Sequence, residues 1–345
     1  MKPGIFVDPA KDIPRISLAR LPTPLTCLER LSKEQGGPRI WIKRDDLTET
    51  AISGNKLRKL EFTAGEAQTQ QATVLITSGG IQSNHCRATA IVAARLGMKC
   101  HLILRGKPDK VLDGNLLLDN LVGASFTFAT AKQFKTPDQL YADVEEHYRA
   151  LGEKPFSIPL GASDEIGLWG YIECARELKS DFQHLGIHPE HIISATGSGG
   201  TMGGLIVGNV LHELNSNIMA FNVCDDEAWF QRKISRDIRS WIKRYKRELP
   251  DQPINIIDGY VGPGYGRADP HVYETIRHVA RVEGIILDPV YTGKAFDAFL
   301  QELAKGRFRQ ASDIVFLHTG GIFGLFPHRD LFADALLTDA ATPQP

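Results

Sequence analysis

The chain has 345 residues, of which 42% are hydrophobic and 23% are charged, close to the averages for soluble globular proteins. Lys and Arg number 40 and Asp and Glu 41, a formal net charge of −1, which excludes a binder of nucleic acid or anionic lipid that works through overall basic charge. The five cysteines form no CxxC pair, no apolar run reaches membrane-spanning length, and residues 1–5 lack the apolar core of a secretory signal. We therefore expect a soluble, cytoplasmic protein that binds neither nucleic acid nor membranes.

Apolar segments of strand length alternate with amphipathic segments of helix length along the chain. The predicted strands are residues 73–77, 100–104, 125–128, 191–194, 220–223, 254–257 and 313–317. The predicted helices are residues 57–68, 84–96, 164–179, 202–214 and 293–305. Because the strands are continuously apolar and alternate with helices, they predict parallel sheets covered on both faces.

The first candidate site residue in chain order is Lys56, which follows a Gly-Asn turn at the start of a predicted helix. A lysine that forms an imine must be neutral, although its ordinary pKa is about 10.4. The nearby cations Arg58 and Lys59 and the positive end of the helix would lower that pKa. The alternative is an ordinary lysine on a solvated helix, so Lys56 needs support from other residues.

The second candidate is the segment of residues 78–85, which joins a predicted strand to a predicted helix. Ser83 and Asn84 are good N-cap residues for that helix. The same side chains, with the exposed N–H groups of the helix start, would also bind a substrate α-carboxylate. Both roles remain open.

The third candidate is a glycine-rich segment, residues 196–201, between a predicted strand and a predicted helix. Its glycines allow a tight turn that directs N–H groups to one point, and the helix start adds partial positive charge, so it predicts a phosphate-binding loop. Met202 stands where a dinucleotide fingerprint needs its third glycine, and the P-loop lysine is missing. The segment therefore favours a phosphate monoester over a nucleotide, with a simple packing turn as the alternative.

Two other segments resemble sites that we do not predict. Residues 232–247 are basic with apolar residues at helical spacing, but the near-zero net charge favours a helix with a solvated charged face over a membrane-surface helix. His184, His188 and His191 have the spacing of metal ligands. Because Pro189 interrupts any helix there, no metal is predicted.

Three later turns lie near predicted strand ends, where open α/β sheets place their ligands: residues 262–266, 288–294 and 318–321. Two of them contain tyrosines, Tyr265 and Tyr291, whose hydroxyls would be able to transfer protons. Half-buried packing is the alternative role.

Taken in this order, the segments resemble the fold-type-II pyridoxal-phosphate enzymes, and most closely the D-cysteine desulfhydrase and 1-aminocyclopropane-1-carboxylate (ACC) deaminase family. The resemblance runs over almost the whole chain and rests on residues 21–25, 41–47, 54–56, 79–85, 196–201, 291 and 318–321. It implies an α/β fold with two three-layer α/β/α domains whose twisted sheets are mostly parallel. Residues 1–60 and 165–345 would form a large cofactor domain, residues 61–164 a smaller mobile domain, and two chains a homodimer.

The resemblance also implies roles for single residues toward pyridoxal 5'-phosphate and a small amino-acid substrate. Lys56 matches the lysine that binds the cofactor covalently. The other matches to cofactor-binding positions are Asn55, Thr196, Gly197, Ser198, Gly199, Gly200, Thr201, Thr292 and Thr319. Ser83, Asn84 and His85 match the segment that binds the substrate carboxylate. Lys56, Ser83, Tyr265 and Tyr291 are the candidates for proton transfer.

Two positions distinguish activities within the family. ACC deaminases typically carry Glu and Leu where this chain has Thr292 and Thr319. A glutamate beside the pyridine nitrogen would keep it protonated and strengthen the ring as an electron sink, which a threonine hydroxyl cannot do. Opening an unactivated cyclopropane should need the stronger sink, so the two threonines favour β-elimination.

We therefore expect a pyridoxal-phosphate dependent carbon–sulfur lyase that converts D-cysteine into pyruvate, hydrogen sulfide and ammonia. L-Cysteate sulfo-lyase and ACC deaminase activities on the same site are the first alternatives. A non-catalytic protein that binds a phosphorylated ligand, and a nucleotide oxidoreductase, are further alternatives. The substrate's chirality and its leaving group stay open.

Overall fold

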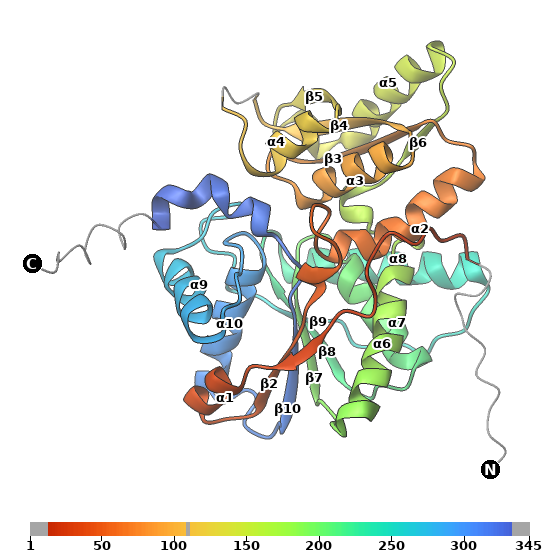
Figure 1. The fold of residues 1–345 in the computed structure, drawn as a ribbon. Helices are drawn as coiled ribbons and strands as arrows, with labels where there is room; N and C mark the ends of the chain where they lie inside the picture. The colour runs from red at the N-terminus through yellow and green to blue at the C-terminus, as the bar shows by residue number, and fades with distance from the viewer. Residues whose placement is uncertain (1–12, 108–110, 333–345) are drawn as a thin grey trace, which may run out of the picture.

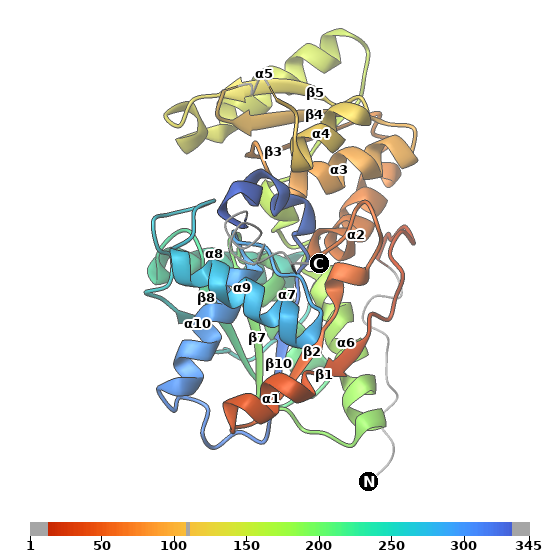
Figure 2. The same cartoon turned by 60° about the vertical axis from the view of Figure 1, so that its left-hand side comes forward.

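The computed structural model describes residues 13–107 and 111–332. It contains a six-stranded and a four-stranded β-sheet, each with helices on both faces. Figure 1 shows the four-stranded sheet above the six-stranded one, and Figure 2 shows the same separation from a second direction.

The strands of the described residues are β1 (Leu25–Cys27), β2 (Arg39–Lys43), β3 (Val74–Gly80), β4 (Lys99–Arg105), β5 (Ser125–Ala129), β6 (Pro155–Ser157), β7 (His191–Thr196), β8 (Asn217–Asn222), β9 (Asn255–Ile257) and β10 (Asp313–Leu317). The α-helices are α1 (Glu29–Gln35), α2 (Asn55–Thr69), α3 (Asn84–Arg95), α4 (Gly114–Leu121), α5 (Pro137–Ala150), α6 (Trp169–Leu185), α7 (Gly200–Leu211), α8 (Glu227–Tyr245), α9 (Pro270–Glu283) and α10 (Thr292–Ala304).

The six-stranded sheet has the order β1-β2-β10-β7-β8-β9, and only β1 runs antiparallel to its neighbour. Its residues alternate between two cores because successive side chains of a strand point to opposite faces. Val315 and Leu317 pack toward α6, α7 and α8, whereas Ile314 and Phe316 pack toward α1, α9 and α10. The sheet is thus buried on both sides, as its continuously apolar strands predicted.

The four-stranded sheet has the order β5-β4-β3-β6 and is entirely parallel. Helices α3 and α4 pack on one face and α5 on the other. Helix α2 connects the two halves of the molecule, since its Leu60 belongs to the core of the smaller sheet and its Phe62 to that of the larger one. The catalytic candidates at the start of α2 therefore lie at the junction between the sheets.

The α/β class and the parallel strands predicted from the sequence are confirmed. Strands β1, β2 and β6 and helices α1, α4, α5 and α9 were not predicted. The helix predicted at 164–179 was wrong at its start, because the Asp164 carboxylate accepts hydrogen bonds from the N–H groups of Ile166 and Gly167 and forms a turn. Helix α6 therefore begins at Trp169.

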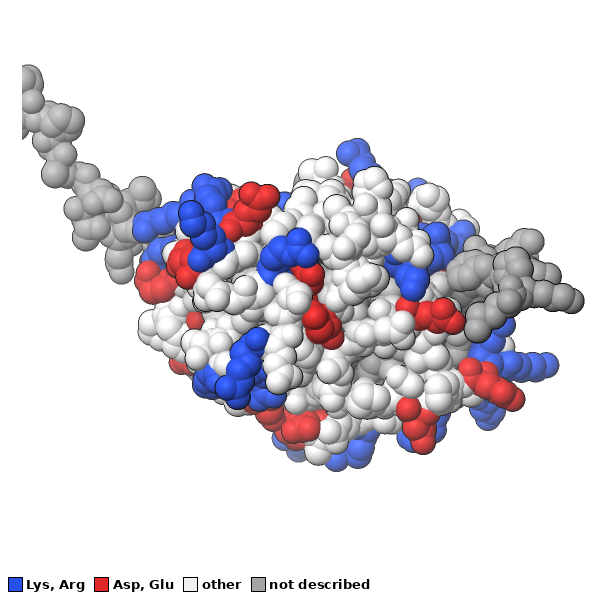
Figure 3. All heavy atoms as spheres, turned by 90° about the horizontal axis from the view of Figure 1, so that it is seen from below, with Lys and Arg blue, Asp and Glu red and all other residues white. Residues whose placement is uncertain are grey.

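Residues 232–245 of the basic segment lie in α8, which confirms the expected helix with a solvated charged face. The apolar residues Phe230, Ile234 and Trp241 of this helix are buried against α6 and α7. Among the described helices, none has the length and apolar character needed to span a membrane. On the face of the molecule seen in Figure 3, acidic and basic side chains are interspersed.

Candidate functional site

A cavity of about 680 Å³ lies between the two sheets, at the carboxyl ends of β3, β4 and β7. Segments far apart in the chain meet there, which is the position that parallel α/β sheets give their ligand sites. The sequence-predicted residues that line it are Asn55, Lys56, Ser83, Asn84, His85, Thr196, Gly197, Ser198, Gly199, Thr201, Tyr265, Tyr291 and Thr319. Gly200 and Thr292 do not line it.

Lys56 lies in the first turn of α2, half-buried in this cavity. The preceding Gly54 has φ +102°, and a Cβ there would lie 2.5 Å from the carbonyl oxygen of Thr319, so only glycine fits this approach. The Lys56 Nζ donates a hydrogen bond to Asn55 Oδ1 at 3.0 Å and lies 5.8 Å from the ring centroid of Tyr291. Its ammonium is therefore held inside the cavity.

Burial, with a smaller contribution from the positive charge of Arg87, lowers the pKa of Lys56 to about 8 against the opposing effect of Asp288. From the sequence, a lowered pKa was expected to come from Arg58 and Lys59. Arg58 is instead turned away, paired at 2.8 Å with both Asp45 and Glu177. The expected direction is correct, but burial is the largest cause, and the cation that contributes, Arg87, comes from α3.

Arg87 connects the two halves of the molecule. It is a buried residue of α3, and its guanidinium donates to the carbonyl oxygens of Ile52 at 2.6 Å and Ser53 at 2.9 Å, just before Lys56. It also donates to Asn115 Oδ1 of α4 at 2.7 Å. The backbone that leads into Lys56 is thus fastened to the four-stranded half.

The glycine-rich loop joins β7 to α7. Gly199 has φ +85°, a conformation that favours glycine, and it is the N-cap residue of α7. Asn55 Nδ2 donates to Thr201 Oγ1 at 3.0 Å, which ties the loop to the residue beside Lys56. The Ser198 hydroxyl lies 2.8 Å from the Ser163 hydroxyl, which also accepts a hydrogen bond from Gly200 N at 3.2 Å.

Lys59, for which the sequence predicted no binding role, is buried against this loop. Its Nζ donates to Gly161 O and Ser163 Oγ, both at 3.2 Å, and a Cβ on Gly200 would lie 2.8 Å from it. Within the described residues, Lys59 forms no ion pair with a carboxylate. Burial, with the charges of Lys56 and Lys233, lowers its pKa well below the usual value. Its spacing of three residues from Lys56 on one helix face was the available sequence signal.

These residues fit pyridoxal phosphate, which carries a phosphate monoester and an aldehyde. The loop, the start of α7 and the Lys59 ammonium offer an anion site that the described carboxylates leave unpaired. The buried Thr196 Oγ1 has no hydrogen-bond partner within the described residues, as expected of a group that receives a ligand. Lys56 supplies the amine that an aldehyde requires.

The segment before α3 has the N-cap role that was one of its two predicted roles. Ser83 is the N-cap residue, and its Oγ accepts a hydrogen bond from Cys86 N at 3.2 Å. His85 Nε2 lies 2.8 Å from Thr77 Oγ1, and burial, with the nearby lysines, lowers the pKa of His85 well below its usual value. This wall of the cavity therefore carries neutral polar groups at pH 7.

The two candidate tyrosines contact each other, with their hydroxyl oxygens 2.6 Å apart. Burial raises the pKa of Tyr265 to about 12 and that of Tyr291 well above its usual value. Lys294, on α10 just after Tyr291, donates to the carbonyl oxygens of Val261 and Gly264 at 2.8 Å each. It thus fastens the loop that carries Tyr265, and both hydroxyls remain protonated at neutral pH.

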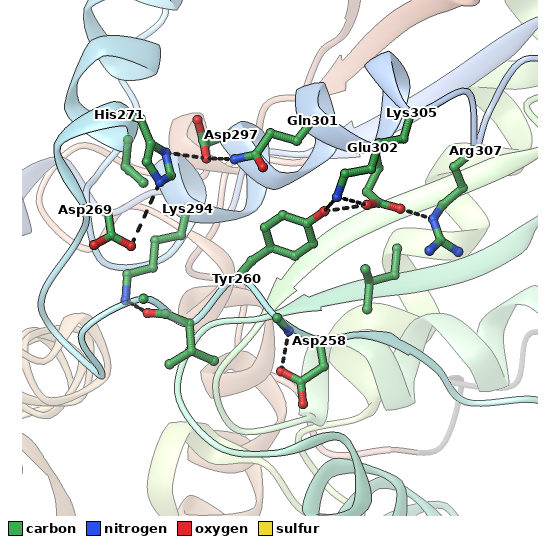
Figure 4. Close-up of a pocket in the computed structure, with 15 residues that line it drawn as sticks. Asp258, Tyr260, Asp269, His271, Lys294, Asp297, Gln301, Glu302, Lys305 and Arg307 are labelled. Carbon is green, nitrogen blue, oxygen red and sulfur yellow. Dashed lines mark hydrogen bonds and ion pairs between the residues drawn. The ribbon is translucent and has the colours of Figure 1, made fainter.

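A second cavity, of about 400 Å³, lies on the other side of this loop and is shown in Figure 4. Polar groups in its lining are paired with one another: His271 Nδ1 lies 3.0 Å from Asp297 Oδ2, and Lys305 Nζ lies 2.9 Å from Glu302 Oε1. We assign it no ligand.

Thr292 lies at the start of α10, outside the main cavity. Its hydroxyl donates to Asp288 Oδ1 at 2.7 Å and accepts from Asp288 N at 2.9 Å. The hydroxyl therefore holds the turn before the helix, and its role toward the cofactor stays a prediction. Thr319, by contrast, lines the cavity.

Comparisons with known proteins agree with this geometry. A family model described as "Pyridoxal-phosphate dependent enzyme" matches residues 16–320. The chain is 38% identical, over 93% of its length and 81% of the relative's, to the bifunctional D-cysteine desulfhydrase/1-aminocyclopropane-1-carboxylate deaminase of Arabidopsis thaliana. It is 37% identical to the D-cysteine desulfhydrase of Serratia proteamaculans, over 91% and 96% of the two chains. A crystal structure of an ACC deaminase homologue superposes with a TM-score of 0.86 at 34% identity, covering 96% of this chain and 99% of the other.

Proposed function

Because the chain belongs to the family of pyridoxal-phosphate dependent enzymes, we propose that it is a carbon–sulfur lyase that converts D-cysteine and water into pyruvate, hydrogen sulfide and ammonia. The relatives' names include both D-cysteine desulfhydrase and ACC deaminase, so the choice between them depends on the site.

The observation that carries the proposal is the set of groups at Thr292 and Thr319. Thr319 brings a neutral side chain to the cavity, and Thr292 is bonded to Asp288, which does not line it. Neither position supplies the carboxylate that would keep a pyridine nitrogen protonated. The electron sink is therefore the weaker one, which suffices to expel sulfide but is poorly suited to opening a cyclopropane ring.

When bound, the cofactor supplies a conjugated ring that accepts the electron pair released at the substrate's α-carbon. In the proposed reaction Lys56 removes the α-proton, because its pKa of about 8 leaves a fraction of the amine neutral near pH 7. Tyr265 and Tyr291 hold their protons at this pH and act as donors. Ser83, Asn84 and His85 bind the substrate carboxylate and so orient the α-carbon.

The test is the purified protein supplied with pyridoxal phosphate. We expect the visible absorption of lysine-bound pyridoxal phosphate, borohydride trapping at Lys56, and pyruvate and sulfide from D-cysteine. Lys56→Ala should lose the trapped adduct and at least about 1000-fold in kcat, since it removes both the nucleophile and the base. Lys243→Ala, at an exposed lysine of α8, is the matched control.

A protein that binds no pyridoxal phosphate would contradict the proposal. A panel of D-cysteine, L-cysteine, L-cysteate and ACC, scored for pyruvate or 2-oxobutyrate, identifies the substrate. Faster formation of 2-oxobutyrate from ACC than of pyruvate from D-cysteine would assign the site to ACC deamination instead.

The proposed enzyme is a homodimer in the cytoplasm. An exposed apolar surface supports the dimer: Val111 and Leu117 lie on the four-stranded half, and Ile322, Phe326 and Leu331 lie near the C-terminal end of the described chain. The contact of Arg329 with Asp113 joins these two parts. Light scattering of the purified protein tests the dimer, and cell fractionation tests the location.

We also propose that residues 61–164 form a mobile domain against residues 1–60 and 165–345. All four strands of the smaller sheet fall inside the first range. Hydrogen exchange that slows across residues 78–85 when substrate is added would support this movement, and unchanged exchange would contradict it.

A further inference from the structure

Arg105 occupies a position at the cavity that the proposed chemistry leaves without a role. It is the last residue of β4, and its register partner on β3 is Gly80. Gly80 opens the segment that ends in Ser83, Asn84 and His85. Because the carboxyl ends of parallel strands lie level, Arg105 stands beside the proposed carboxylate site, and it lines the same cavity as Lys56.

Two aromatic rings hold the guanidinium of Arg105. Its central carbon lies 5.4 Å from the ring centroid of Tyr265 and 5.6 Å from that of Phe134, and both rings line the cavity. Such stacking fixes the plane of a guanidinium and leaves its N–H groups at the edge free to bind an anion. Within residues 13–107 and 111–332, no carboxylate or carbonyl accepts a hydrogen bond from Arg105.

The charges around Arg105 favour an anion at this end of the cavity. The basic residue Lys135 lines the cavity next to Phe134. Of the acidic residues that line the cavity, Asp138 is the nearest to Arg105 in the sequence. The hydroxyl of Tyr265 is tied to Tyr291 and does not neutralise the guanidinium. A substrate with its amine at Lys56 and its carboxylate at Ser83 would thus face a further, unoccupied cation.

We propose that Arg105, held between Tyr265 and Phe134, forms a subsite for a negatively charged substituent on the substrate's β-carbon, with a sulfonate as the best-matched group and a thiolate as a second. This inference rests on the proposed function and names its substrate class. A planar guanidinium offers paired N–H donors that match two sulfonate oxygens, whereas ACC has no charged group at that carbon.

The elimination that this subsite assists is balanced without an added oxidant or reductant. The α-proton passes to Lys56, the carbon–sulfur bond breaks, and the electron pair leaves with sulfur as sulfite or hydrosulfide. Water then converts the released aminoacrylate into pyruvate and ammonia. Arg105 binds the sulfur group before the bond breaks and stabilises the anion as it leaves.

The experiment measures binding of 3-sulfopropanoate and of propanoate to the holoenzyme by calorimetry. Neither ligand has an amine, so binding does not depend on turnover. We expect 3-sulfopropanoate to bind the wild type more tightly, and Arg105→Gln to weaken it by about tenfold or more relative to propanoate, since a charge-assisted hydrogen-bonded pair is lost. Arg105→Lys should restore part of this, and Lys132→Gln, at an exposed lysine that does not line the cavity, is the matched control for charge alone.

A second measurement uses turnover. The ratio of kcat/KM for cysteate to that for 3-chloroalanine, whose β-substituent is uncharged, should fall about tenfold or more in Arg105→Gln. An equal effect on both substrates, an equal effect of Lys132→Gln, or a wild type that binds the two carboxylic acids alike would overturn the subsite. Selective binding in a protein that releases no sulfur product would contradict the proposed function and leave the subsite standing.

Discussion

The two walls of the main cavity differ in their charge. The wall on the six-stranded side carries the glycine-rich loop, and Lys59 is buried behind it against Ser163, where no described carboxylate forms an ion pair with it. The wall formed by residues 78–85 carries neutral hydroxyl, amide and imidazole groups. A permanently charged phosphate matches the first wall, and a substrate that must enter and leave matches the second. The comparison separates residues expected to control cofactor affinity from those expected to control substrate affinity.

Lys59→Met should produce the largest effect, a loss of affinity for pyridoxal phosphate. The variant removes the amine of α2 that is buried against the glycine-rich loop, the proposed phosphate site, so the Kd for pyridoxal phosphate should rise by about 100-fold, the loss expected for charge-assisted hydrogen bonds. Equilibrium titration of the apoprotein measures it. Lys59→Arg keeps the charge and is the control. A Kd within twofold of wild type would remove Lys59 from the phosphate site.

Arg87 tests whether a residue of the four-stranded half controls the pKa of Lys56. In the wild-type apoprotein, the rate at which Lys56 reacts with pyridoxal phosphate should rise with pH through a midpoint near pH 8, since only the neutral amine reacts. Arg87→Met removes a positive charge, so Lys56 should hold its proton more tightly and the midpoint should move upward. If the midpoint rises by about one pH unit, the neutral fraction of Lys56 at pH 7 falls by about tenfold, and the reaction rate falls with it.

The control for this experiment is Arg87→Lys, which keeps a charge at the position. Because Arg87 also binds the carbonyl groups of Ile52 and Ser53, thermal unfolding must show that both variants are folded. A midpoint that is the same in wild type and Arg87→Met would show that burial alone sets the pKa of Lys56.

Ser83→Ala should produce the smallest effect, and on the substrate side only. The KM for D-cysteine should rise by roughly fivefold, as expected for one lost hydrogen bond, while the Kd for pyridoxal phosphate stays near its wild-type value. The lost N-cap should also lower the free energy of unfolding by about 1 kcal/mol. Ser83→Thr keeps both hydrogen bonds. An equal rise in cofactor Kd would show that the two walls do not act separately.

The sequence predicted the family, the fold class and the dependence on pyridoxal phosphate, and the comparisons confirm all three. The glycines and the lysine at residue 56 were recognisable because their chemistry depends on local sequence: a turn, a helix start and an amine. All but two of the candidate site residues meet in one cavity. Their roles toward substrate and cofactor stay predictions.

The contributions of Arg87, Ser163 and Arg105 were not predictable in the same way. Each comes from a segment that the tertiary fold brings to the site, and Arg87 reaches Ile52 across 35 positions of sequence. The direction of the Thr292 hydroxyl was likewise not predictable, since it bonds to Asp288 four residues earlier. Short motifs specify backbone shape, while the direction of a side chain depends on tertiary contacts.

Helix α10 has a mechanical consequence for the tyrosine pair. Tyr291 immediately precedes the helix. Lys294, in the first turn, donates hydrogen bonds to the carbonyl oxygens of Val261 and Gly264, in the loop that carries Tyr265. A small shift of the helix along its axis would move Tyr291 directly. It would also move Tyr265, because the Lys294 ammonium binds the loop that carries this residue. We therefore expect the 2.6 Å distance between the two phenol oxygens to stay nearly constant when the cavity walls move.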